Sequence, residues 1–402
     1  MVLSAKNASL YGLAAPGAEV TAEVTRSSSV NIVKKATADA RGEWAMELGP
    51  VAASLEPASI TLSAGATRIT LGGVLFGTVL FCSGQSNMAI TLGAFTSYQG
   101  HCPGPNCENV TAILEASPKF ARQLRVMTVG GGGRANPGPP SPLVPGVRSA
   151  SKSVWSGSFP KSLPAFSAEC WAAGTALAAS KGFETTPIGL VSAAVGGSMI
   201  QSWMSPAAMA ACPHAQLQHP PAFGEQGQWF NGMVAPLRLL RPDAVVWHQG
   251  EENADDAVDY KCWQRAMVQD WRRLFGLPRL PYVFVQLQPC GIPPDQRYAQ
   301  ASTLFTLPSV GMAACYDLGD PDPTNKNGLC HSRYKTECGR RLALEVRRLL
   351  DGAPKDWNVT ARLVPDKSSR SKFSILVTSS HLVQRGDADG PSLVPSGTLL
   401  YW

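Results

Sequence analysis

The sequence predicts an α/β protein in which a small β-sandwich precedes an open, mostly parallel sheet. Apolar and polar residues alternate through the first 75 residues, and after them short, wholly apolar runs alternate with helical stretches. Wholly apolar runs are typical of parallel strands that helices cover on both faces. We therefore expect a β-sandwich-like domain over 1–75, an α/β domain over 76–352 and a C-terminal β segment over 353–402.

The first part contains alternating segments separated by turns. Ser9 to Gly12 leads into the turn at Ala15-Pro16-Gly17, and strands are expected over 19–25, 42–48 and 59–63. Segments of period two that recur at short intervals, without helical periodicity, indicate a small β-sandwich.

The second part alternates buried strands with helices. Strands are expected at five apolar runs, 79–82, 124–128, 188–191, 244–247 and 282–287. Helices are expected at about 166–181, 228–239, 255–275 and 332–350. In an open sheet of this kind the ligand site lies at the carboxyl ends of the strands. The glycine- and proline-rich segment 129–150 is expected to be an irregular loop, and it lacks the Gly-Lys-Ser/Thr ending of a phosphate-binding loop.

Composition excludes two classes of protein. Of 402 residues, 44% are hydrophobic and 16% are charged, and no apolar run reaches the length of about 18 residues that a membrane-spanning helix needs. The net charge of +6 is spread along the chain in short pairs such as Arg272-Arg273, which are typical of solvated helix faces. We therefore expect no membrane span and no nucleic acid partner.

The ten cysteines and the glycosylation sequons favour a secreted or lysosomal protein. No Cys-x-x-Cys pair occurs, which argues against a zinc ribbon or a thioredoxin-type site. Cys82 and Cys170 fall in predicted core elements and are expected to be buried thiols, whereas Cys102 and Cys107 are close enough to close a small loop. No signal peptide is recognisable, so the chain is either intracellular or lacks its native start. The sequons lie at Asn7, Asn109 and Asn358.

The sharpest chemical signal is Ser86. A buried strand ends in the small-residue turn Ser83-Gly84-Gln85, and Ser86 stands where a helix would begin. This arrangement exposes a hydroxyl at the end of the strand and directs backbone N–H groups toward it. The alternative is that Ser86 merely caps a helix.

Two adjacent glycines follow the strand expected at 188–191. The turn Val195-Gly196-Gly197-Ser198 comes after the run at 188–191, and its glycines bring backbone N–H groups close to a ligand. The alternative is that the glycines are needed only because a tight strand-to-helix turn requires them, without any ligand.

An amide and a carboxylate follow the strand at 244–247. The segment Trp247-His248-Gln249-Gly250-Glu251 places Gln249 and Glu251 at the same edge of the sheet. The alternative is that Glu251 begins a helix, where an acidic residue suits the helix dipole.

A histidine precedes the last long amphipathic helix. His331 lies in the segment Leu329-Cys330-His331-Ser332, and a loop histidine with an ordinary pKa near 6.5 is a plausible general base. Zinc binding by Cys330, His331 and Cys338 is disfavoured because the spacing is wrong for a zinc finger.

Together these segments resemble the sialate O-acetylesterases of the SGNH hydrolase superfamily, which are also similar to bacterial acetyl-xylan esterases. The resemblance spans nearly the whole chain and implies a three-layer α/β/α catalytic domain over 76–352. It is carried, in order, by Gly84-Gln85-Ser86-Asn87-Met88, Gly196-Gly197-Ser198, Phe230-Asn231-Gly232-Met233, Trp247-His248-Gln249-Gly250-Glu251-x-Asn253 and Asp270-Trp271-Arg272.

The resemblance implies a serine esterase that removes O-acetyl groups from sialic acids through an acyl-enzyme, without metal or cofactor. Ser86 would be the nucleophile and His331 the general base. The oxyanion hole would be formed by the Ser86 N–H, a Gly196 or Gly197 N–H and the Gln249 side-chain amide. The alternatives are an acetyl-xylan or other carbohydrate O-acetylesterase, and a sugar-binding homologue without activity.

The triad acid and the two chain ends depart from the family pattern. Relatives carry an Asp two or three residues before the histidine, where this chain has Leu329 and Gly328. Glu251 is the first choice to orient His331, and Asp320 or Asp322 is the second. The chain is expected to be shortened at both ends, since relatives have a fuller first strand and a longer final β segment.

Overall fold

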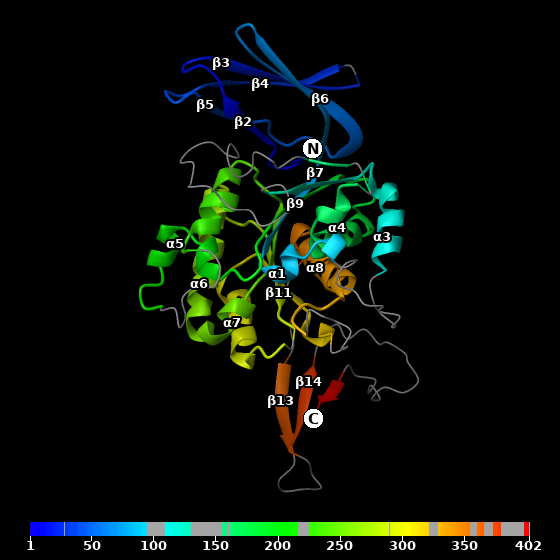
Figure 1. Ribbon diagram of the computed structural model, residues 1–402, viewed down its shortest axis with the longest axis vertical. Coiled ribbons are helices and arrows are strands. Elements are labelled where there is room, and N and C mark those ends of the chain that lie inside the picture. Colours follow the sequence, from blue (N-terminus) through cyan, green and yellow to red (C-terminus); the bar gives the residue numbers. More distant parts are fainter. Residues whose placement is uncertain are drawn as a thin grey trace. The chain divides into compact units, whose positions relative to one another are not determined.

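The computed structural model describes residues 1–27, 29–94, 109–129, 155–157, 159, 161–215, 225–288, 290–320, 329–353, 360–365, 373–378 and 398–401. The chain forms two compact units, Met1–Leu350 and Asp351–Trp402 (Figure 1). The smaller unit contains an antiparallel sheet of three described strands, β13 (Thr360–Pro365), β14 (Phe373–Thr378) and β15 (Thr398–Tyr401).

The amino-terminal part of the larger unit is built from strands. They are β1 (Val2–Ser4), β2 (Ser9–Leu13), β3 (Glu19–Arg26), β4 (Ser29–Thr37), β5 (Glu43–Glu47) and β6 (Ser54–Ala64). Strands β4, β3, β6 and the next strand, β7 (Thr67–Gly84), pair in this order as an antiparallel sheet, and β2 pairs with β5. Leu10, Val20, Trp44, Ile60 and Phe76 pack between these strands as a separate small core.

Strand β7 joins this part to the central sheet. Its first half pairs with β6, whereas its second half, from Thr78 to Gly84, lies between β9 (Ile188–Ala194) and β10 (Ala244–His248). The central sheet has the order β8-β9-β7-β10-β11-β12, and all of these strands are parallel. The remaining strands are β8 (Leu124–Thr128), β11 (Tyr282–Gln286) and β12 (Val310–Ala314).

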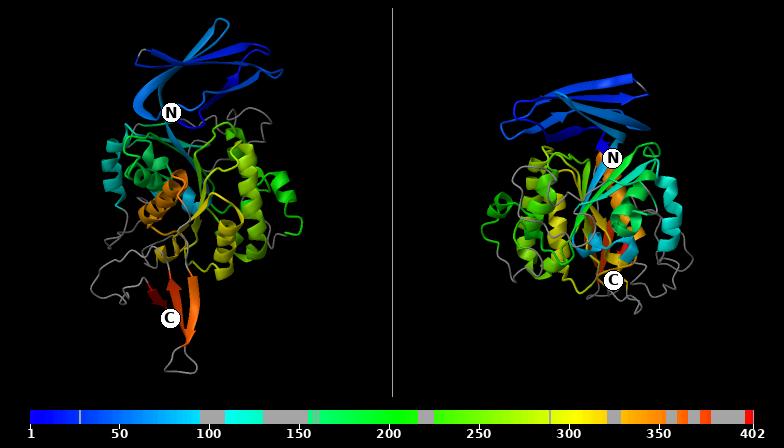
Figure 2. Two further views of the ribbon diagram at one scale, coloured as in Figure 1. Left: turned by 180° about the vertical axis from the view of Figure 1, so that it is seen from behind. Right: turned by 45° about the horizontal axis from the view of Figure 1, so that its top comes forward.

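Helices cover both faces of the central sheet (Figure 2). On one face, Phe81 and Trp247 pack against Trp271 of α6. On the other face, Leu80 and Val246 belong to the core formed by α4 and α8. The α-helices are α1 (Ser86–Ala89), α3 (Val110–Ala116), α4 (Ala168–Ala178), α5 (Pro206–Ala210), α6 (Ala257–Leu274), α7 (Pro294–Thr306) and α8 (Lys335–Leu350). Short turns of other helix types are η1 (Ser117–Phe120), η2 (Leu163–Ala165), η3 (Ile200–Trp203), η4 (Phe230–Val234), η5 (Ala235–Leu237), η6 (Glu251–Asp256) and η7 (Tyr316–Leu318).

The predicted α/β class, with a parallel central sheet after a small β-sheet part, is confirmed. Several details differ from the prediction. The segment 228–239 is a π turn followed by a 3₁₀ turn, because Pro236 cannot continue the hydrogen-bond ladder of an α-helix. Helix α7 and strand β12 were not predicted from the sequence.

Eight cysteines of the described part form four disulfides. They are Cys82–Cys170, Cys212–Cys262, Cys290–Cys330 and Cys315–Cys338. The prediction that Cys82 and Cys170 are buried thiols is therefore wrong: both are fully buried, but they are bonded to each other across β7 and α4. The predicted loop between Cys102 and Cys107 lies outside the described residues. Among the described helices, none has the length and hydropathy needed to cross a membrane.

Candidate active site

The order of the central sheet sets the place of the site. Strand β7 comes first along the chain among the parallel strands, yet β9 lies on one side of it and β10 on the other. The connection after β7 leads to β8 on one side, and the connection after β9 crosses to β10 on the other side. Ligands bind at the carboxyl ends of the strands at such a reversal. Ser86, Gly196 and Glu251 follow the three strands that meet there.

The turn after β7 depends on a glycine. Gly84 has a φ of 137°, and a Cβ added to it would lie 2.0 Å from the carbonyl oxygen of His248 on β10. This close approach lets the Gln85 N–H donate to the same carbonyl, at 2.9 Å. The Gln85 side-chain oxygen in turn accepts from the N–H groups of Gly250 and Glu252. The turn that presents Ser86 is thus tied to the segment after β10.

Ser86 and His331 form a hydrogen-bonded pair. Ser86 is the first residue of α1, and its Oγ lies 2.8 Å from Nε2 of His331. The two residues are 245 positions apart, and both are half-buried in the wall of a cavity of about 500 Å³. The cavity is lined by Gln85, Ser86, Val195, Gly196, Gly197, Trp229, Glu251, Glu252, Ile292, Cys330 and His331.

The glycine turn after β9 borders the serine. A Cβ added to Gly196 would lie 3.6 Å from Cβ of Ser86, so the glycine backbone borders the nucleophile directly. Gly197 has a φ of 70°, a conformation that favours glycine. Within the described part of the chain, the N–H groups of Ser86, Gly196 and Gly197 donate to no protein acceptor. Backbone N–H groups without an internal acceptor are the kind of donor that an oxyanion hole requires.

Gln249 is placed differently from the prediction. Its side chain is fully buried and does not line the cavity. Its Nε2 donates to the Ser198 carbonyl and to Oδ1 of Asn253, and its Oε1 accepts from Tyr260. Both amide hydrogens are therefore used inside the protein. These hydrogen bonds connect the turn after β9 to η6, and they leave no amide hydrogen for a substrate oxygen.

Of the carboxylates expected near His331, Glu251 is linked to the residue before the histidine and Asp320 to a residue after it. Glu251 lines the cavity, and its Oε1 accepts from Nδ2 of Asn87 at 2.6 Å; the same Nδ2 donates to the carbonyl of Cys330, the residue before His331. Arg333, two residues after His331, donates to the Asp320 carboxylate from its backbone N–H and from its guanidinium group. Asp322 lies outside the described residues.

A buried group of four charges lies under the cavity. Burial opposes charge on His248, but Glu169 at 2.7 Å and Glu251 at 3.5 Å raise the pKa of this histidine to about 9. Burial likewise disfavours the charged forms of Glu169 and Glu251, yet the neighbouring cations lower the pKa of both carboxyl groups. Lys335 binds the other oxygen of Glu169 at 3.1 Å. Two carboxylates and two cations thus give a network without net charge.

Glu252 differs from these residues because it lines the cavity without an ion-pair partner in the described part of the chain. Burial, and then the adjacent Glu251, raise the pKa of its carboxyl group. The cavity wall therefore carries a carboxylate that has not been neutralised by a cation.

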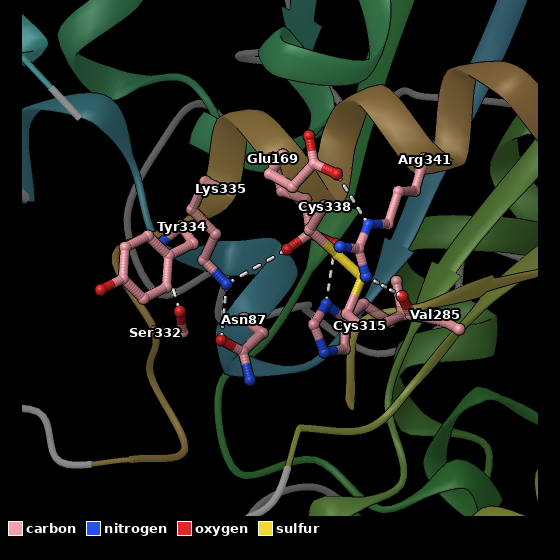
Figure 3. The surroundings of a disulfide bond; sticks show 12 residues. Asn87, Glu169, Val285, Cys315, Ser332, Tyr334, Lys335, Cys338 and Arg341 are labelled. Carbon is pink, nitrogen blue, oxygen red and sulfur yellow. Dashed lines mark hydrogen bonds and ion pairs between the residues drawn. A yellow bond between two sulfur atoms is a disulfide. The ribbon is translucent and has the colours of Figure 1, made fainter. Parts of the chain in front are cut away.

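Three potential metal ligands, Glu169, His248 and Cys338, offer atoms within 4.8 Å of one another. The sulfur of Cys338 is bonded to Cys315 (Figure 3). Glu169 is shared by His248 and Lys335. A disulfide sulfur is not a thiolate, so this group is an ion-pair network and not a metal site. The same reason excludes the zinc set weighed from the sequence, since Cys330 is bonded to Cys290.

Comparison with known proteins finds similarity to carbohydrate esterases. Residues 160–347 match the family model described as carbohydrate esterase, sialic acid-specific acetylesterase. The sialate O-acetylesterases of Homo sapiens and Pongo abelii are each 28% identical over 382 residues, which cover 85% of this chain and 67% of the relative. The chain is similar to this carbohydrate esterase family over nearly half of its length. It is accordingly a carboxylic ester hydrolase.

The fold of this esterase has a counterpart among solved structures. A carbohydrate acetylesterase from Xanthomonas citri superposes with a TM-score of 0.71 at 24% identity, over 94% of this chain and 79% of that one. The likeness covers both the β-sheet part and the α/β part of the esterase, and it confirms the fold.

Sequence reasoning missed the residues beneath the site of this esterase. Asn87, Glu169 and Lys335 do not line the cavity, but they connect the segments that do. One signal was present in the sequence. Lys335 is the first residue of a helix, where a cation opposes the helix dipole, so another partner must hold it there.

Proposed function

We propose that this esterase removes O-acetyl groups from carbohydrates, with Ser86 as nucleophile and His331 as general base. The observation that carries the proposal is the 2.8 Å contact between Ser86 Oγ and His331 Nε2 in the wall of the cavity. A nucleophile and a base within hydrogen-bond reach are the essential pair for acyl transfer from an ester.

The reaction proceeds in two halves. Ser86 Oγ attacks the acetyl carbonyl carbon while His331 Nε2 takes the hydroxyl proton, and the oxyanion accepts from the N–H groups of Ser86 and of Gly196 or Gly197. The C–O bond to the sugar then breaks, and His331 returns the proton to the sugar oxygen. Water attacks the acetyl-enzyme in the same way, again with His331 as base, and releases acetate and free Ser86.

Glu251 and Asp320 would support the base indirectly. Glu251 holds Asn87, which donates to the carbonyl before His331, and Asp320 holds Arg333 after it. We therefore assign Glu251 a positioning role, transmitted to His331 through the Asn87 amide.

The first candidate substrate is an O-acetylated sialic acid, because the family model is described as sialic acid-specific and the relatives are named sialate O-acetylesterases. A neutral acetylated polysaccharide such as acetyl-xylan is the second. It is favoured by Glu252, since a carboxylate in the cavity wall accepts hydrogen bonds from sugar hydroxyls but repels the carboxylate of a sialate. The four disulfides support the proposal of a secreted or lysosomal location.

Acetate release tests the activity and the substrate class together. Purified protein would be supplied with 9-O-acetylated N-acetylneuraminic acid, acetyl-xylan and a neutral O-acetylated monosaccharide, beside the variants Ser86→Ala and His331→Ala. We expect release from at least one sugar, and a loss of at least about 10³-fold in both variants. Release at the wild-type rate by folded Ser86→Ala protein would refute the proposed mechanism, and the ratio between sugars decides between the two substrates.

A further inference from the structure

A lysine is buried under the active site where the mechanism has no use for a cation. The side chain of Lys335 is 1% exposed, and its Nζ donates to Oε2 of Glu169 at 3.1 Å and to Oδ1 of Asn87 at 2.6 Å. A buried ammonium group is costly unless acceptors surround it. Figure 3 shows Lys335 and Asn87 directed toward one another beside the Cys315–Cys338 disulfide.

The lysine dictates which way the Asn87 amide faces. An ammonium group only donates hydrogen bonds, so the amide oxygen must face Lys335 and the NH₂ group must face away. On that side Nδ2 has two acceptors, Oε1 of Glu251 at 2.6 Å and the Cys330 carbonyl at 2.8 Å. Both hydrogens are used. A reversed amide would set NH₂ against the ammonium and its oxygen against two acceptors.

This amide connects the two reacting residues. Asn87 follows Ser86 in α1, and Cys330 precedes His331. The hydrogen bond from Asn87 to the Cys330 carbonyl therefore joins the backbone that carries the nucleophile to the backbone that carries the base. The bond therefore bears on the separation of Ser86 Oγ and His331 Nε2, which is 2.8 Å.

We propose that Lys335 is a positioning residue of this esterase, which fixes the Asn87 amide and thereby holds the His331 loop against the helix that carries Ser86. The inference rests on the proposed roles of Ser86 and His331. It assigns a function to a charge that would otherwise serve only as the partner of Glu169.

Three variants separate positioning from structural support. Lys335→Met removes the ammonium group and keeps the length of the side chain. Asn87→Asp still accepts from Lys335 but has no hydrogen to donate to Cys330. The matched control is Arg272→Met, which removes another buried cation. Arg272 binds the carbonyls of Leu280, Pro308 and Ser309 before strands β11 and β12, at the sheet edge opposite the site.

The main readout is the rate at which a fluorophosphonate probe labels Ser86, because this rate needs the serine–histidine pair but no particular sugar. The kcat and KM for acetate release and the melting temperature complete the comparison. We expect Lys335→Met and Asn87→Asp to lower the labelling rate and kcat by about 100-fold, as a displacement of about 1 Å does, with KM within about threefold of wild type. Arg272→Met should lower the melting temperature and keep both rates.

The outcomes discriminate clearly. Labelling of folded Lys335→Met protein at the wild-type rate would overturn the inference and leave Lys335 as structural support. If Lys335→Met does not fold, Asn87→Asp decides in the same way, since it keeps the buried ion pair. Rapid, Ser86-dependent labelling by a wild-type protein that releases acetate from no sugar would instead refute the proposed function and leave the positioning result intact.

Discussion

Substitution of Gly196 by alanine should lower kcat without a large change in the free energy of unfolding. The backbone at this position does not require glycine, because Gly196 is not among the residues with positive φ. An added Cβ would lie 3.6 Å from Cβ and 3.7 Å from Cα of Ser86, which are ordinary van der Waals distances. We therefore expect Gly196→Ala to fold, with a free energy of unfolding within about 1 kcal/mol of wild type.

Activity should respond differently. Alanine keeps the backbone N–H, but its methyl group would lie against Ser86 in the cavity wall, so we expect the acetyl group to bind displaced from that N–H and to lose its hydrogen bond. The loss of one such donor costs about 3 kcal/mol of transition-state stabilisation, which corresponds to roughly 10²-fold in kcat. The assay is the rate of hydrolysis of a chromogenic acetate ester, beside a thermal melt of the same sample.

The control is Gly84→Ala. There the added Cβ would meet the His248 carbonyl oxygen at 2.0 Å with a φ of 137°, so this variant should lose stability whatever its effect on chemistry. A kcat of folded Gly196→Ala protein within threefold of wild type would refute the assignment of this turn to the oxyanion hole.

Two further predictions concern a disulfide and a buried acid. Replacement of both Cys290 and Cys330 by serine should lower kcat by about tenfold, because Cys330 adjoins His331. The control is the same change at Cys212 and Cys262, which close a loop of similar length; it should cost about 2–4 kcal/mol of stability and leave kcat unchanged. Equal kcat in the two double variants would contradict the predicted effect at Cys290 and Cys330. Burial, partly offset by hydrogen bonds from Val79 and Ser4, raises the pKa of Asp243 from 3.8 to about 6, so its protonated form is favoured in the folded state. The contribution of protonated Asp243 to the free energy of unfolding is complete below pH 4 and is lost as pH rises through 6. Urea unfolding at pH 4 and pH 7 should therefore show that wild type loses about 3 kcal/mol of stability relative to Asp243→Asn. The same difference in unfolding free energy between the two proteins at both pH values would exclude this linkage.

The sequence predicted the parts of the site that lie at strand ends. Ser86 and Gly196 each follow a wholly apolar run, and the carboxyl ends of parallel strands meet at one edge whatever else the chain does. His331 belongs to no strand end, and its place was predicted from its position before a helix and from family resemblance. The structure brings it to Ser86.

Side-chain direction was beyond the reach of the sequence. Gln249 was correctly placed at the edge of the sheet, but whether its amide faces a ligand or Asn253 depends on neighbours that are distant in the chain. Cys82 and Cys170 were correctly expected to be buried, yet a buried thiol and a buried half-cystine have the same apolar surroundings in sequence. Lys335 could be found only by asking why a cation begins a helix.

The long strand β7 has a consequence for how this protein can be divided. Its first half is a member of the amino-terminal sheet, and its last residue, Gly84, lies two positions before the nucleophile. A cut at residue 75 would pass through this strand and strip its partners β1 and β6 from the segment that aims Ser86. The amino-terminal sheet is therefore no detachable module that recombination or engineering could exchange freely. Any transplant of the esterase site has to carry the whole strand, and with it the sheet that starts it.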